Sequence, residues 1–150
     1  PDLVMAAPDT GGTKRANAYS KFLNCDLAIC YKQRKVHNQI ESMTVIGDVK
    51  GKDVVIIDDL IDTAGTLTKS AQMMMEHGAK TVRALITHPV LSGPAYERIE
   101  DSVLTELVVT DTIPLKQESS KIKVLGVADL FASTMRSIVS DESISSQFII

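Results

Sequence analysis

The chain has 150 residues, of which 44% are hydrophobic and 23% charged, so it can bury a sizeable core and is too apolar for a disordered protein. Its net charge of −3 gives no reason to expect nucleic acid or an anionic membrane as a partner, and the 4% of aromatic residues include no tryptophan for base stacking. No apolar run approaches the roughly 20 residues of a membrane span, and no secretory signal is recognisable.

The first third of the chain alternates apolar runs with a helical pattern. Residues 2–8 form an apolar run of strand length, which the turn-rich segment "PDTGGT" ends. Residues 13–24 place apolar side chains at helical spacing and predict a helix, and residues 26–32 predict a second strand. Residues 33–41 lack an apolar face and predict an exposed excursion, whereas residues 42–49 alternate as a strand does.

The remaining elements continue the alternation. Residues 54–59, "VVIIDD", predict a buried strand, followed by a loop over residues 60–66 and a helix over residues 66–77, with Gly78 at its carboxyl end. Residues 81–90 predict the next strand. We expect a loop and short helix over 92–102, strands over 105–112 and 121–127, a final amphipathic helix over 128–140 and a tail to residue 150.

This order of elements predicts an α/β fold, with a mainly parallel central sheet flanked by helices on both faces. A short antiparallel flap is expected around residues 30–46, and residues 1–150 are interpreted as a single domain. Because the chain opens directly on a strand, we expect it to be the second half of a longer protein. Cys25 and Cys30 fit neither a redox pair nor a zinc site, so free thiols and a cytoplasmic location are expected.

Two adjacent carboxylates, Asp58 and Asp59, end an apolar strand, and they repel each other unless a cation or hydroxyl groups satisfy them. The segment "DTAGT", residues 62–66, supplies a tight turn whose amides would lie at the amino end of the next helix, a site suited to phosphate. Carboxylates could accept hydrogen bonds from vicinal hydroxyls. Phosphate at one end and a diol at the other describe a sugar phosphate, whereas the alternative is a helix-capping loop beside solvated acids.

The segment "VVIIDDLIDTAGT" resembles the phosphoribosyl-binding signature of type I phosphoribosyltransferases. Two further segments, "APDTGGTKRANAYSK" and "YKQRK", resemble the metal-site segment and the catalytic flexible loop of the ribose-phosphate diphosphokinase (PRPP synthase) family. Further segments, among them "VVTDTIPL" and "SDESISSQF", resemble this family in the same order. The resemblance covers the whole chain and corresponds to the carboxyl-terminal half of the family.

The resemblance implies a role for individual residues. Asp9 matches a ligand of Mg²⁺, and Lys32 and Arg34 match the catalytic pair of the flexible loop. Ala64 stands where many relatives have glycine, and we expect it to be tolerated only with a negative φ. The residues expected to bind ribose 5-phosphate are Asp58, Asp59, Asp62, Thr63, Ala64, Gly65 and Thr66.

The reaction implied by the resemblance is Mg²⁺-dependent transfer of the diphosphoryl group of ATP to the C1 hydroxyl of ribose 5-phosphate, giving PRPP and AMP. Because the amino-terminal half of the family supplies most adenine contacts and a histidine that shares the metal, we expect the isolated chain to be inactive. The family assembles as dimers that build a hexamer, so a homo-oligomer is expected. Two alternatives remain: a nucleobase phosphoribosyltransferase, and a non-catalytic PRPP-binding or regulatory subunit.

Overall fold

The computed structural model describes residues 2–33 and 42–149, which contain one seven-stranded sheet and four α-helices. The strand order across the sheet is β3-β2-β1-β4-β5-β6-β7. The strands are β1 (Leu3–Ala7), β2 (Asp26–Gln33), β3 (Ser42–Ile46), β4 (Asp53–Ile61), β5 (Thr81–Pro89), β6 (Glu106–Thr110) and β7 (Ile122–Leu125). The helices are α1 (Thr13–Leu23), α2 (Gly65–Glu76), α3 (Ala95–Glu100) and α4 (Ala128–Val139), and a 3₁₀ turn follows at Ser145–Gln147.

The sheet is parallel except at one edge, as the sequence predicted. β2 and β3 pair antiparallel, with Ile29 opposite Ile46 at one end of the register, which confirms an antiparallel flap in this part of the chain. β1 has β2 on one side and β4 on the other, both parallel to it, so the chain moves in opposite directions across the sheet from this point. In open α/β sheets, ligands bind beyond the carboxyl ends of the strands at such a reversal.

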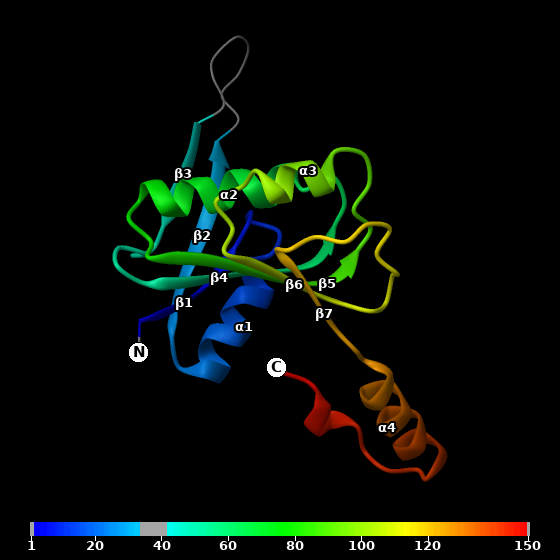
Figure 1. The fold of residues 1–150 in the computed structure, drawn as a ribbon. Helices are drawn as coiled ribbons and strands as arrows, with labels where there is room; N and C mark the ends of the chain where they lie inside the picture. Colours follow the sequence, from blue (N-terminus) through cyan, green and yellow to red (C-terminus); the bar gives the residue numbers. More distant parts are fainter. Residues whose placement is uncertain (1, 34–41, 150) are drawn as a thin grey trace.

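Helices cover both faces of the sheet, which confirms the predicted layers (Figure 1). On one face, α2 and α3 lie over the main core, where Val54, Ile56 and Met74 are fully or almost fully buried. On the opposite face, α1 packs against β1, β2 and β4 over a smaller cluster that includes Met5 and Ile57. The apolar runs of β1 and β4 therefore occupy the centre of the sheet, and their carboxyl ends open at one edge.

β4 is longer than the sequence predicted. The expected loop over residues 60–66 is shorter, because Leu60 and Ile61 still pair with His88 and Pro89 of β5. β1 pairs with β4 only as far as Ala6 opposite Ile56, so β4 extends past the end of its neighbour. Asp58 and Asp59 therefore lie in the part of β4 that has no pairing with β1. Their side chains border the open edge of the sheet.

The helix predicted near the carboxyl terminus is present as α4, but none of its residues is buried. It extends beyond β7, away from the other helices (Figure 1). Its amphipathic pattern therefore corresponds to an apolar surface, which includes Leu130, Phe131, Met135 and Ile138. Among the described residues, no helix is long and apolar enough to cross a membrane.

Candidate functional site

The turn between β4 and α2 is built around Ala64, which adopts a left-handed backbone conformation with φ of 61°. The expectation that alanine is tolerated here only with a negative φ is wrong. Ala64 lies between the end of β4 and the first residue of α2, Gly65, and the residue is 4% exposed. The left-handed residue reverses the chain sharply, so that only three residues separate Ile61, the last residue of β4, from the first residue of α2.

The backbone amides of this turn have no partner within the part of the chain that the structure describes. Thr68 is the first residue of this region whose N–H group makes a helical hydrogen bond. It donates to the carbonyl of Ala64 at 3.0 Å. For residues 63–67, the described protein atoms offer no acceptor to the N–H groups. The first N–H groups of a helix have no acceptor within the helix, and they lie at the positive end of the helix dipole. This turn can therefore bind an anion.

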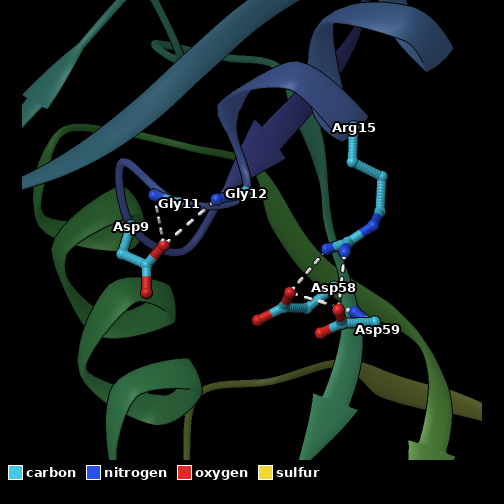
Figure 2. A network of polar contacts seen from close by, with 6 residues as sticks. All are labelled: Asp9, Gly11, Gly12, Arg15, Asp58 and Asp59. Atoms are coloured by element: carbon cyan, nitrogen blue, oxygen red, sulfur yellow. Dashed lines mark hydrogen bonds and ion pairs between the residues drawn. The ribbon is translucent and has the colours of Figure 1, made fainter.

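Arg15 satisfies the paired carboxylates of β4. Its guanidinium donates from Nη1 to Asp58 Oδ1 and from Nη2 to Asp59 Oδ2, each at 2.7 Å. Figure 2 shows the guanidinium reaching from the start of α1 to both carboxylates. The fork of Arg suits such a two-point contact, because its donors lie in one plane and cannot be deprotonated. This contact fixes the two acids side by side, which their mutual repulsion would otherwise oppose.

The two carboxylates differ in acidity. Partial burial raises the pKa of Asp58 above its ordinary value, and the neighbouring Asp59 charge adds to this, while Arg15 acts in the opposite direction. For Asp59, desolvation also favours the protonated form, but the Arg15 guanidinium and the hydrogen bonds to this carboxyl together outweigh it and hold its pKa below the ordinary value. The oxygens of both carboxyl groups can accept hydrogen bonds from a diol.

Asp9 lies on the loop that follows β1. Its Oδ1 accepts hydrogen bonds from the backbone N–H groups of Gly11 at 2.8 Å and Gly12 at 3.2 Å, as Figure 2 shows. Gly11 permits this close turn, since a Cβ there would lie 3.1 Å from Asp9 Oδ1. The loop is also tied to α2, because the buried Ser70 hydroxyl donates to the carbonyl of Pro8 at 2.9 Å. The carboxylate is therefore oriented at the same edge of the sheet as the β4 acids.

One cavity of about 200 Å³ brings most of the predicted site residues together. It is smaller than the pockets of about 300 Å³ and more that hold drug-sized ligands, and so suits a small, polar molecule. Asp59 does not line this cavity. It lies next to Asp58, which does, and Arg15 contacts both carboxylates. The residues that line it are Pro8, Asp9, Asp58, Leu60, Ile61, Asp62, Thr63, Ala64, Gly65, Thr66, Leu67 and Ile86.

A larger and more open groove of about 720 Å³ lies behind the turn, between α2 and α3. It shares Thr63, Gly65 and Thr66 with the cavity, but neither Asp9 nor Asp58 lines it. Its charged residues are of both signs, since Lys69 and Arg98 lie beside Glu97 and Asp101. The groove therefore lacks the carboxylates that the sequence associates with a sugar, and we assign the site to the smaller cavity.

The catalytic role of the pair Lys32 and Arg34 stays a prediction. The backbone of Lys32 lies in β2, opposite Met43 of β3. Arg34 lies outside the described residues.

Sequence reasoning missed four side chains that shape the site: Arg15, Ser70, Ser92 and Arg98. Ser92 donates from its hydroxyl to the Asp62 carboxylate, and Arg98 donates from Nη1 to the carbonyl of Thr63 at 2.9 Å. The paired acids required a cation, but Arg15 lies 43 positions away from Asp58, so only the fold could identify it.

Replacing Ala64 tests the left-handed turn. In Ala64→Gly, about 1–2 kcal/mol of left-handed strain is relieved. This gain is offset by the loss of a buried methyl, about 0.8 kcal/mol, and by the greater entropy of the unfolded chain, about 0.4–1 kcal/mol. The free energy of unfolding in urea should therefore change little. Ala64→Val should lower it by about 2 kcal/mol or more, because a β-branched residue is strained at positive φ. Equal stability of the Val and Gly variants would contradict this turn geometry.

Comparison with known proteins identifies the family. Residues 32–149 match the model of the phosphoribosyl synthetase-associated domain. The chain is 52% identical over 149 residues to the ribose-phosphate pyrophosphokinase of Wolinella succinogenes, a match that includes 99% of this chain and 48% of that protein. The chain thus spans about half the length of the relatives that it matches.

Solved structures agree with this assignment. The phosphoribosylpyrophosphate synthetase of Mycobacterium smegmatis superposes with a TM-score of 0.85 at 36% identity, over 93% of this chain and 46% of that one. The orotate phosphoribosyltransferase of Aeropyrum pernix has a TM-score of 0.55 at 22% identity, over 90% of this chain and 65% of that one, and so shares the fold. The chain therefore belongs to the phosphoribosyl synthetase-associated domain family and has the fold that ribose-phosphate pyrophosphokinases share with phosphoribosyltransferases.

Proposed function

We propose that this chain is the ribose 5-phosphate-binding part of a ribose-phosphate diphosphokinase. The whole enzyme would transfer the diphosphoryl group of ATP to the C1 hydroxyl of ribose 5-phosphate and release PRPP and AMP. One observation supports the proposal: residues 63–67, whose amides have no acceptor among the described residues, and the Asp58 carboxyl line the same small cavity. Amides suit the 5-phosphate, and carboxylates suit the ring hydroxyls.

The residues of this chain would act by binding and orientation. The amides of residues 63–67 would hold the phosphate at the amino end of α2, and Asp58 and Asp59 would accept hydrogen bonds from the sugar hydroxyls. Such contacts fix the C1 hydroxyl for attack on phosphorus, and positioning supplies much of the catalysis in phosphoryl transfer. By resemblance, Lys32 and Arg34 would stabilise the charge of the transferring diphosphoryl group.

Asp9 fits the role of a Mg²⁺ ligand. Its carboxylate is oriented by two amides at Oδ1, and among the described residues no hydrogen bond occupies Oδ2. Mg²⁺ keeps several waters and is commonly held by one or two carboxylates together with substrate phosphates, so one oriented carboxylate is sufficient on this side. When bound, the ion would neutralise charge on the diphosphoryl group.

The rest of the proposal concerns the whole protein. We propose a cytoplasmic enzyme that assembles as a homo-oligomer, with dimers that build a hexamer, and that meets ATP through residues outside this chain. The isolated chain should then bind ribose 5-phosphate weakly and form no PRPP.

The proposal is tested by adding ribose 5-phosphate to the chain and following the amide resonances of residues 63–67 by NMR, which detects weak binding. These amides should shift in a saturable way, whereas an equal concentration of ribose should leave them unchanged. A parallel assay with ATP and Mg²⁺ should show no release of AMP. Unchanged amides, or rapid AMP release that depends on ribose 5-phosphate, would contradict the proposal.

A further inference from the structure

Three consecutive carbonyls before the left-handed residue all accept hydrogen bonds from one segment, residues 90–98. The amides of Val90 and Leu91 donate to the carbonyl of Ile61 at 3.0 and 3.2 Å, and the amide of Ser92 donates to that of Asp62 at 3.2 Å. Arg98, on α3, completes the series through its bond to the carbonyl of Thr63. We refer to residues 90–98 as the clasp.

The clasp determines which polar groups of the turn remain available. A peptide unit whose carbonyl is bonded on one side presents its N–H group roughly in the opposite direction, because the two groups are antiparallel across the planar bond. The carbonyls of residues 61–63 face the clasp, so the N–H groups of residues 62–64, which share these peptide units, face away from it, and those of residues 63 and 64 have no acceptor among the described residues. The clasp therefore separates acceptors from donors in the way that an anion site requires.

Arg98 acts from outside the cavity. It lines the open groove between α2 and α3 and is absent from the lining of the smaller cavity. Its Nη1 lies against the first residue of α2, since a Cβ built on Gly65 would come within 3.3 Å of it. The guanidinium thus contacts the turn immediately before and immediately after Ala64, the residue with positive φ.

We infer that Arg98 is a positioning residue for the phosphoryl group of the sugar phosphate. It holds the Thr63 carbonyl away from the cavity, which keeps the left-handed turn at Ala64 and aims the next amides at the ligand. A carbonyl that turned inward would present its oxygen to the phosphate, and like-signed oxygens repel. This inference rests on the proposed function and adds a residue that does not itself touch the ligand.

The inference predicts a loss of affinity without a matching loss of fold. In Arg98→Gln, the dissociation constant for ribose 5-phosphate, from NMR titration, should rise between about threefold and tenfold, as expected for an exposed hydrogen bond to a charged donor. Arg98→Lys keeps the charge but not the planar fork, so its constant should lie between those of the parent chain and Arg98→Gln. Arg136→Gln, on exposed α4, removes the same charge and should leave the constant unchanged.

A second readout distinguishes positioning from general stability. In the ligand-free Arg98→Gln variant, the amide resonances of residues 63–67 should move more than those of the sheet, while the urea midpoint stays near that of Arg136→Gln. Binding by Arg98→Gln equal to that of the parent chain would overturn the inference and leave the proposed function intact. Full affinity in Arg98→Lys would also overturn it, because charge alone would then be enough. If the parent chain does not bind the sugar phosphate, the proposed function fails first.

Discussion

Replacing Arg15 with methionine should weaken both the fold and the site. The two ion pairs to Asp58 and Asp59 are lost, and two adjacent carboxylates remain without their cation. The side chain of Arg15 is 34% exposed and that of Asp59 is 64% exposed, so screening by solvent limits the loss of unfolding free energy to about 1–2 kcal/mol. The dissociation constant for ribose 5-phosphate should rise about tenfold or more, because the acids separate and the cavity becomes more negative.

The effect should depend on pH with a defined sign. Desolvation raises the pKa of Asp59, but Arg15 and the hydrogen bonds to this carboxyl together hold it below its ordinary value, so the stabilisation from the pair is present above about pH 4 and is lost as the pH falls through the pKa of folded Asp59. The raised pKa of Asp58 acts in the opposite direction, and its contribution is lost as the pH rises through the folded value. The stability difference between the parent chain and Arg15→Met should therefore be larger at pH 7 than at pH 3.

Two comparisons make this result interpretable. Lys14→Met removes the same charge from the adjacent, exposed position of α1 and should change stability and affinity little. In the Arg15→Met background, Asp59→Asn should recover part of the lost stability, because one of the two repelling charges is removed. An Arg15→Met chain that kept the stability of Lys14→Met at pH 7 would contradict the role given to Arg15.

A glutamate at Thr66 should stabilise the helix and abolish binding. Thr66 is an exposed residue in the first turn of α2, where a carboxylate interacts favourably with the helix dipole by about 0.3–1 kcal/mol. The same carboxylate would lie where the phosphate is expected, and repulsion at such short range should raise the dissociation constant for ribose 5-phosphate about a hundredfold or more. Urea unfolding and NMR titration measure the two effects separately.

Gln72→Glu is the matched control for this variant. It adds the same charge to the same helix but lines only the groove behind the turn, so it should reduce affinity much less. Thr66→Ser, which keeps a hydroxyl at the site, should bind nearly as the parent chain does. If Thr66→Glu bound ribose 5-phosphate as well as Gln72→Glu, the phosphate could not lie at the amino end of α2.

The fold was largely predictable because its central strands, β1 and the first half of β4, are buried apolar runs. Continuous apolar runs such as residues 54–57 indicate a parallel sheet, and turn residues such as Gly78, which has φ of 90°, mark the ends of helices. The end of β4 was not predictable, because Leu60 and Ile61 read equally well as loop or strand. Their state depends on pairing with β5, which is remote in sequence.

The site was predictable where its chemistry is local and unpredictable where it depends on packing. The acids and the small-residue turn follow one another in the sequence, so their meeting in one cavity could be expected. Arg15 and Arg98 come from α1 and α3, and nothing in their neighbouring residues indicates which carboxylate or carbonyl they will reach. The expectation that Ala64 is tolerated only with a negative φ was wrong because the clasp can hold a left-handed alanine in place, a tertiary effect that intrinsic preference does not include.

The most direct measurement is a crystal structure of the chain after soaking with ribose 5-phosphate. We expect electron density for the phosphate within hydrogen-bonding distance of the amides of residues 63–67, with ring hydroxyls within hydrogen-bonding distance of Asp58 and Asp59. Density for the sugar phosphate in the groove between α2 and α3, or a turn whose amides had closed onto neighbouring carbonyls and left the cavity empty, would contradict this expectation.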